Sequence, residues 1–221
     1  MSNKCIYHFN KLIFGLLIIL PLANWGSSIQ AKQLLVFGDS LSAAYGMDIE
    51  QGWVHLLEQH LNSNQFDKWD DNPVFQVSNA SISGETTTGG LARLELSLQE
   101  FNPDIVLLEL GANDGLQGFP TNRISDNLNA MLDIIEQHGS QAILIGISIP
   151  PSYGPRYIDQ FRAVFPTIAS QRELPFIDLY REDFYLKPEL MQRDGLHPTA
   201  IAQPIIRDLM IDFLLQEQLL N

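Results

Sequence analysis

An aspartate and a serine follow directly on a short apolar run near the start of the chain. In the segment LLVFGDSLSAAYG, residues 34–46, the apolar run ends at Gly38, and Asp39 and Ser40 come next. One interpretation is structural, because Gly, Asp and Ser favour turns and a serine there can cap a helix. The other is a nucleophile held where a buried strand reaches the surface. A serine hydroxyl near neutral pH needs a base, so the second interpretation requires a partner elsewhere in the chain.

The sequence offers one histidine in a position suited to act as that base. Beyond residue 31 the histidines are His55, His60, His138 and His197. The first three fall in helical patterns or at a helix end, where surface or packing roles explain them. His197 lies instead in the loop-like segment DGLHP, where Asp194 stands three residues earlier and can accept the imidazole N–H. This spacing is weak evidence alone, so a structural role for the pair stays open.

Attack on a carbonyl group also requires hydrogen-bond donors for the negative oxygen that forms. Gly84, in NASISGET, permits close approach of the backbone, so its N–H can point into a crevice. Asn113, in GANDG, offers a side-chain amide, and Ser40 offers its own N–H. Gly84 and Asn113 are each ordinary turn residues when taken singly. Their joint position after two predicted strands favours an oxyanion hole.

The elements that must position these residues alternate between apolar runs and amphipathic segments. Runs rich in Val, Ile and Leu, typical of parallel strands buried on both faces, predict strands over residues 33–37, 74–78, 105–110, 142–147 and 176–178. Periodicity and chain order predict helices over residues 53–61, 91–101, 124–135, 157–170 and 204–219. We therefore predict a doubly wound, three-layer α/β/α domain with a five-stranded parallel sheet.

This topology brings the candidate residues to one edge of the sheet. In a flavodoxin-like strand order the first and third strands are neighbours, and ligands bind between their carboxyl ends. Ser40, Gly84 and Asn113 each follow one of the first three strands. Asp194 and His197 precede the last helix, which can return them beside the first strand.

Blocks along the chain resemble those of a known family. They are FGDSLSAAYG, NASISGETTTGGLARL, LELGANDGLQGF, YLKP and DGLHP. In this order they are similar to the conserved blocks of the SGNH (GDSL) hydrolases, most of all to the secreted bacterial thioesterase, lysophospholipase and arylesterase enzymes. The resemblance runs from about residue 34 to the last helix. It implies the flavodoxin-like SGNH-hydrolase fold and a serine esterase acting on carboxylic esters or thioesters of acyl chains.

The resemblance also implies roles for the residues. Ser40 would be the nucleophile, His197 the base and Asp194 its orienting acid, while Gly84 and Asn113 would complete the oxyanion hole with the Ser40 N–H. We interpret Asp39 as structural, within the turn. Two segments, GANDGLQGF and IPPSYGPRY, resemble acyl-binding loops. They contain six residues that either line an acyl groove or only pack the loops, namely Leu116, Phe119, Ile149, Pro150, Tyr153 and Tyr157.

The sequence also bears on alternative activities. The G-x-S-x-G elbow of α/β-hydrolases is absent from the sequence. A metal-dependent phosphoesterase is one alternative, with Asp39, Asn113, Asp114, Asp194 and His197 as candidate ligands. Two-metal sites of that kind usually draw on several histidines, and only His197 lies in a suitable loop. A carbohydrate-ester deacetylase of the same family, or a non-catalytic binding module, is a further alternative. Attack by a hydroxyl with a histidine base needs no ion, so we expect neither metal nor cofactor.

The first residues form a separate unit. Lys4 and Lys11 precede an apolar run over residues 12–23, and small residues follow it. This pattern predicts a secretory signal peptide over residues 1–31, cleaved after Ala31 or alternatively after Ser28, and a hydrolase domain over residues 32–221. The run is shorter than the roughly 20 residues that span a bilayer, which disfavours a permanent membrane anchor. The protein is thus expected to be exported, to the periplasm or beyond.

Composition limits the partners. The formal net charge of −13 would become −15 on cleavage, since two lysines and no acidic residue are lost, so binding to nucleic acid is not expected. Cys5, the only cysteine, would leave with the signal, and no disulfide would remain. The expected partner is a small acyl ester or thioester, and the expected state is a monomer without a stable membrane anchor.

Overall fold

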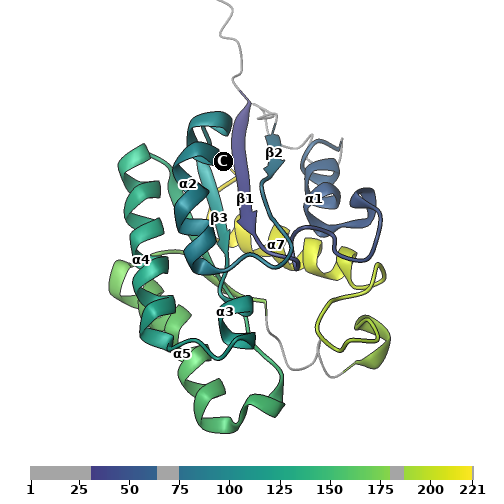
Figure 1. The fold of residues 1–221 in the computed structure, drawn as a ribbon. Coiled ribbons are helices and arrows are strands. Elements are labelled where there is room, and N and C mark those ends of the chain that lie inside the picture. Colours follow the sequence, from purple (N-terminus) through teal and green to yellow (C-terminus); the bar gives the residue numbers. More distant parts are fainter. Residues whose placement is uncertain (1–30, 64–74, 180–186, 221) are drawn as a thin grey trace, which may run out of the picture.

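Five parallel strands form the centre of the protein (Figure 1). The computed structural model describes residues 31–63, 75–179 and 187–220, so residues 1–30 of the predicted signal peptide and residue 74 of the predicted strand 74–78 lie outside the described residues. The strands are β1 (Lys32–Gly38), β2 (Phe75–Asn79), β3 (Ile105–Glu109), β4 (Gln141–Gly146) and β5 (Phe176–Asp178). Their order is β2-β1-β3-β4-β5, with every pairing parallel. The prediction of a flavodoxin-like sheet with β1 beside β3 is confirmed.

Helices cover both faces of this sheet. The longer ones are α1 (Trp53–Leu61), α2 (Thr87–Phe101), α4 (Thr121–His138), α5 (Pro155–Arg172) and α7 (Gln203–Gln216). Short helices are η1 (Ile49–Gln51), α3 (Ala112–Leu116), η3 (Pro151–Tyr153) and η4 (Pro188–Leu190). The α1 and α7 helices pack together on one face, and α2, α4 and α5 cover the other (Figure 1). Across the described residues, no helix combines the length and apolar character that crossing a bilayer requires.

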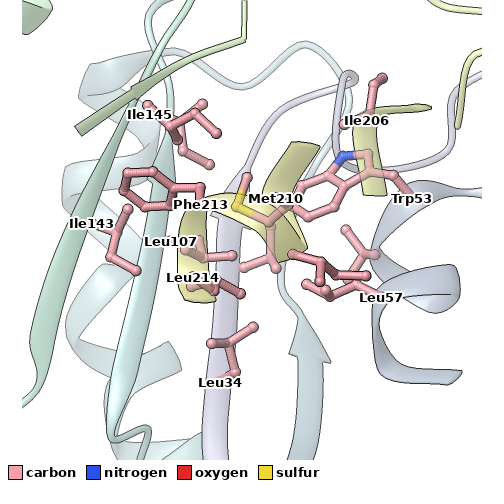
Figure 2. Packing of buried hydrophobic residues seen from close by; sticks show 14 of the residues in the cluster. Leu34, Trp53, Leu57, Leu107, Ile143, Ile145, Ile206, Met210, Phe213 and Leu214 are labelled. Carbon is pink, nitrogen blue, oxygen red and sulfur yellow. The ribbon is translucent and has the colours of Figure 1, made fainter. Parts of the chain in front are cut away.

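A buried apolar cluster joins the sheet to α1 and α7 (Figure 2). Its labelled side chains come from three strands and from both helices, and they are Leu34, Trp53, Leu57, Leu107, Ile143, Ile145, Ile206, Met210, Phe213 and Leu214. Burying a side chain of this size contributes about 1.5–3 kcal/mol. The cluster therefore fixes α7 against β1, which is the contact that decides where the preceding loop lies.

Hydrogen bonds at Trp53 tie the beginnings of α1 and α7 together. The Trp53 N–H donates to Oε1 of Gln203, the first residue of α7, at 2.9 Å, and Gln203 is buried. The Trp53 indole N–H donates to the Leu41 carbonyl oxygen at 3.2 Å. The loop after β1 and the start of α7 thus share one anchor.

Several helices differ from the prediction. Helix α4 extends beyond residues 124–135 at both ends, and α7 ends at Gln216 and not at residue 219. Helix α2 begins at Thr87 and not at residue 91, with the Thr86 hydroxyl capping it by accepting from the Gly89 N–H. Its first residues include Gly90, where a Cβ atom would come within 2.4 Å of Leu110, so close packing outweighs the weak helix propensity of glycine. Helix α3 was not expected, because five residues with a glycine show no helical period.

Candidate active site

Ser40, His197 and Asp194 form a chain of hydrogen bonds at the carboxyl end of β1. Ser40 is the second residue after β1, and the other two lie in the loop before α7. Ser40 Oγ is 2.8 Å from His197 Nε2, and His197 Nδ1 is 2.7 Å from Asp194 Oδ2. An ionised carboxylate only accepts, so Nδ1 carries the proton and Nε2 is left to accept from the Ser40 hydroxyl. The three side chains are arranged for transfer of the Ser40 proton to His197.

Asp194 is fixed by its own loop. Its Oδ1 atom accepts from the backbone N–H groups of Leu196 at 2.9 Å and His197 at 3.1 Å. Partial burial alone would raise the pKa of the Asp194 carboxyl, but the hydrogen bonds from the His197 side chain and from these N–H groups outweigh it and lower the pKa below its usual value. Asp194 is therefore ionised at neutral pH and can stabilise a positively charged imidazole.

Gln192 connects the loop of the base to the loop of the nucleophile. Its Nε2 atom donates to the Tyr45 carbonyl oxygen at 2.9 Å and to the Pro198 carbonyl oxygen at 3.0 Å. Its backbone N–H donates to the His197 carbonyl oxygen at 2.7 Å. These contacts join segments almost 150 residues apart in sequence, so no local pattern predicts them. Gln192 thus helps to hold the two loops in register.

Two backbone N–H groups near the serine lack acceptors. Among the described residues, no hydrogen bond uses the N–H of Ser40 or of Gly84. Gly84 has a φ of +83°, a conformation that glycine adopts readily, and no atom lies within 4 Å of where a Cβ would stand. The Ile82 N–H donates to the Gly38 carbonyl oxygen at 3.1 Å, which holds the Gly84 loop against the end of β1.

Arg93 of α2 binds the loop that carries Gly84. Its Nε atom pairs with Glu85 at 2.7 Å, and its Nη1 atom donates to the Ala80 carbonyl oxygen at 2.8 Å. The guanidinium stacks over the Phe37 ring of β1, 4.0 Å from its centroid. Both ends of the loop that carries Gly84 are thus bound to one side chain.

Asn113 lies in α3, and its side chain is directed toward the turn after β1 and the Gly84 loop. Its Nδ2 atom donates to the Asp39 Oδ2 atom at 3.1 Å and to the Glu85 carbonyl oxygen at 2.9 Å. Both amide hydrogens are therefore engaged within the protein. These bonds orient the amide well. To donate to an oxyanion, it would have to share or give up its hydrogen bond to one of these two acceptors.

Asp114, next in sequence, anchors α3 to α2. It is fully buried, and it accepts from the Thr87 N–H at 2.7 Å and from the Thr87 hydroxyl at 2.6 Å. A carboxylate at the first turn of α2 is favoured by the positive end of the helix dipole. Asn113 is therefore carried by a short helix whose acidic residue, Asp114, is bound to the start of α2.

Two buried carboxyl groups lie beneath the serine. Asp39 accepts from the Leu41 N–H at 3.0 Å, which agrees with its expected role in the turn, and burial raises the pKa of its carboxyl to about 7. Glu109 of β3 accepts on Oε2 from the Ser42 hydroxyl at 2.9 Å and from the Asp39 N–H at 3.3 Å. Complete burial, with the charge of Asp39 adding to it, raises the pKa of Glu109 well above its usual value. Sequence reasoning missed Glu109, which stands within an apolar strand.

An apolar pocket of about 70 Å³ opens beside Ser40. Its lining comes from the loops after β1, β3 and β4 and from the His197 loop, and comprises Ser40, Leu41, Ala112, Asn113, Leu116, Ser148, Ile149, Pro150, Leu196 and His197. Three of the residues expected to contact an acyl chain are among them, namely Leu116, Ile149 and Pro150. The other apolar members, such as Leu41 and Leu196, were not singled out, although each follows or precedes a candidate catalytic residue.

The remaining three expected acyl contacts lie outside this lining. The Tyr153 hydroxyl donates to the Leu116 carbonyl oxygen at 2.8 Å, and the Tyr157 hydroxyl donates to the Phe119 carbonyl oxygen at 2.5 Å. Phe119 packs under the guanidinium of Arg123, 4.2 Å from the ring centroid. Tyr153 thus binds the backbone of the pocket residue Leu116 at the end of α3, and Tyr157 binds the backbone of the loop that follows.

The acidic residues considered as metal ligands have other partners. Within the part of the chain that the structure describes, no three His, Cys, Asp or Glu side chains are grouped to hold an ion. Asp194 is bound to His197, and Asp114 to Thr87.

The domain has a parallel sheet between two layers of helices. At the carboxyl edge of the sheet lie the hydrogen-bonded residues Ser40, His197 and Asp194 and an apolar pocket. This is the architecture of a hydrolase. Residues 36–203 match the GDSL-like Lipase/Acylhydrolase family. The arylesterase of Vibrio mimicus is 43% identical over 182 residues, which are 82% of this chain and 88% of that protein. The thioesterase 1/protease 1/lysophospholipase L1 of Escherichia coli (strain K12) is 41% identical over 180 residues, 81% of this chain and 82% of that protein.

A solved structure agrees with these relatives. The psychrotrophic esterase EstA from Pseudoalteromonas sp., in a form inhibited by monoethylphosphonate, superposes with a TM-score of 0.77 and is 41% identical. The match covers 86% of this chain and all of that one. The chain belongs to the GDSL-like lipase/acylhydrolase family, and it is a hydrolase of the esterase and thioesterase type. The family resemblance in the sequence blocks is confirmed.

Proposed function

We propose that the protein hydrolyses carboxylic esters and thioesters of acyl chains through a covalent acyl-Ser40 intermediate. The observation that carries this proposal is the continuous chain of contacts from Ser40 Oγ to His197 at 2.8 Å and from His197 to Asp194 at 2.7 Å. The similar esterase EstA was solved inhibited by monoethylphosphonate, and phosphonates of this kind capture activated hydroxyl groups. Both facts support a serine nucleophile.

The reaction would proceed in two halves. Ser40 Oγ forms a bond to the acyl carbon while its proton passes to His197 Nε2, and Asp194 stabilises the resulting imidazolium. The carbon–oxygen or carbon–sulfur bond then breaks, and His197 returns the proton to the departing alcohol or thiol. A water molecule next gives a proton to His197 while its oxygen forms a bond to the acyl carbon. The bond between that carbon and Ser40 Oγ then breaks, His197 returns the proton to Oγ, and the carboxylic acid is released.

The oxyanion would be held by the N–H groups of Ser40 and Gly84 and by the Asn113 amide. The two N–H groups have no other acceptor among the described residues, so they meet a new negative oxygen without losing a bond. Asn113 would shift one hydrogen from Asp39 or from the Glu85 carbonyl to the oxyanion. The two backbone donors are set in place before the reaction, so they stabilise the transition state with little reorganisation.

The acyl group would occupy the pocket beside Ser40. Its volume of about 70 Å³ suits a short acyl chain, and longer chains must extend past Leu116 and Pro150 to the surface. We further propose that residues 1–31 are a signal peptide, that the mature chain acts as an exported monomer, and that it needs no metal or cofactor. Prolonged dialysis against EDTA should then leave hydrolysis of a short aryl ester intact.

The test is covalent labelling with a fluorophosphonate probe followed by peptide mass spectrometry. The adduct should lie on Ser40, and Ser40→Ala should abolish both labelling and ester hydrolysis while keeping the wild-type melting temperature. A panel of p-nitrophenyl esters of increasing chain length, with palmitoyl-CoA, lysophosphatidylcholine and an acetylated xylan, would then define the substrate. Hydrolysis of the xylan alone would favour the deacetylase alternative, and activity dependent on a divalent metal would contradict the serine mechanism.

A further inference from the structure

Tyr45 lies against the base. Its ring and the His197 ring have centroids 4.3 Å apart and planes inclined by 33°, a tilted stacking contact. The position of the Tyr45 backbone is fixed by the hydrogen bond from Gln192 to its carbonyl oxygen. Tyr45 nevertheless remains 47% exposed. Covering His197 uses part of the ring and leaves the rest facing solvent.

The chemistry of the proposed reaction locates the departing group next to this ring. His197 Nε2 must return a proton to the leaving oxygen, so that oxygen has to come within hydrogen-bond distance of Nε2. The acyl chain occupies the pocket lined by Leu116, Ile149 and Pro150, and Tyr45 is not part of that lining. The alcohol side of an ester therefore leaves the site along His197 and outside the acyl pocket.

We infer that Tyr45 forms a leaving-group subsite that binds flat aromatic alcohols against the exposed part of its ring. The inference rests on the proposed function, because it takes His197 as the proton donor to the leaving group. An aromatic leaving group can stack on or meet the edge of the Tyr45 ring, and an aliphatic one gains only general apolar contact. The subsite thus selects phenolic over aliphatic esters independently of the acyl chain.

The test compares two butyrate esters whose leaving alcohols have similar acidity but different shape. One is 2-naphthyl butyrate, and the other is hexafluoroisopropyl butyrate. The ratio of their kcat/KM values is measured for the wild type, Tyr45→Phe, Tyr45→Leu and a control, Leu96→Ala, which removes an exposed apolar side chain on α2. We expect Tyr45→Phe and the control to keep the ratio. Tyr45→Leu should lower it by about threefold to tenfold, the size of one aromatic contact.

The outcomes separate the possible roles. If Tyr45→Leu lowers both esters equally, Tyr45 acts only by positioning His197 and the inference is overturned. If Tyr45→Leu does not fold, the inhibition constants of 2-naphthol and its fully saturated analogue are measured on the wild type. The subsite predicts tighter inhibition by 2-naphthol, and equal inhibition would contradict it. A Ser40→Ala variant that still hydrolyses both esters would instead refute the proposed function itself.

Discussion

Asn113 and Asp39 are joined by a hydrogen bond of 3.1 Å from the Asn113 amide to the Asp39 carboxyl. The other Asp39 oxygen accepts from the Leu41 N–H, so each oxygen of the carboxyl has a donor. Asp39 therefore connects the turn that presents Ser40 to the amide that we assign to the oxyanion. A substitution at Asp39 should therefore change the orientation of the Asn113 amide more than it changes the affinity for substrate.

Replacing Asp39 by Asn tests that connection. The new side chain has a single acceptor for two donors, so its amide group must face either the Leu41 N–H or the Asn113 amide. We expect kcat to fall by roughly tenfold or more, within the range for a misplaced oxyanion donor, with KM little changed. Steady-state kinetics on a short aryl ester measure this effect. A higher KM with unchanged kcat would show that Asp39 acts on substrate binding instead.

Removing the amide itself should cost more. Asn113→Ala deletes one oxyanion donor, and we expect kcat to fall by about 10²–10³, or roughly 3–4 kcal/mol. KM should change little, because the negative charge develops only in the transition state. The melting temperature must match the wild type, since Asn113 also bonds to Glu85 in the folded protein. A loss confined to KM would contradict the oxyanion role.

The contact between Ser40 and His197 predicts non-additive kinetics. Ser40→Ala and His197→Ala each remove the same attack step, so the double variant should be little worse than either single one. Asp194→Asn should be less damaging than His197→Ala, because His197 can still accept a proton when its tautomer is correct. Rate constants for the four variants against one ester decide the matter. Losses that multiply in the double variant would mean that the two residues serve separate steps.

Glu109 should make stability depend on pH. Its pKa is raised in the folded state by burial, so the folded protein binds protons that the unfolded chain releases. The resulting stabilisation is complete below the unfolded value of about 4 and is lost as pH rises through the folded pKa, with Asp39 contributing up to about pH 7. Glu109→Gln keeps an acceptor for Ser42 and should flatten this decline.

Urea unfolding of Glu109→Gln and the wild type between pH 4 and 9 measures that difference. Glu100→Gln, at an exposed position of α2, is the matched control and should follow the wild type. Parallel curves for Glu109→Gln and the wild type would mean that Glu109 is already ionised in the folded protein.

The hydroxyls of Tyr153 and Tyr157 should influence chain-length preference. Each is bonded to a carbonyl oxygen of the loop after Asn113, and each such bond contributes about 0.5–1.5 kcal/mol to holding it. Tyr153→Phe combined with Tyr157→Phe should loosen the pocket wall at Leu116. We expect the kcat/KM ratio of decanoate to acetate esters to rise severalfold. Thr167→Val, which removes a hydroxyl bonded within α5 to Ala163, is the control and should keep the ratio.

Strands β1, β3 and β4 were predictable because each contains a continuous apolar run buried on both faces, whereas β2 and β5 are only partly buried. The predicted bounds of β1 and β4 differ from the observed ones by a single residue at each end, and β5 agrees fully. Helix ends were less predictable where packing decides them. The first turn of α2 contains two glycines, which have weak helix propensity and hide the start of the helix in the sequence. At Gly90 a glycine is required because Leu110 occupies the space that a side chain would need.

The candidate site was predictable to the extent that its residues stand beside strand ends. Ser40, Gly84 and Asn113 are marked by the turn residues around them, and His197 by its loop. Gln192, Tyr45 and Glu109 carry no such mark, because their roles arise from contacts between distant segments or from burial. Tyr153 and Tyr157 show a further limit. Their aromatic rings indicated acyl contact, whereas their hydroxyls bind the loop backbone.

The hydrogen bond between Ser40 and His197 spans 157 positions of the chain. The nucleophile lies in the turn after the first strand, and the base is brought beside it only when α7, the last helix of the sequence, packs on the sheet. A chain whose synthesis or folding stops before α7 docks therefore holds a serine without a base. Such long-range closure is slow compared with forming local helices. Ester hydrolysis can thus serve as a direct kinetic signal for completion of the native state during refolding.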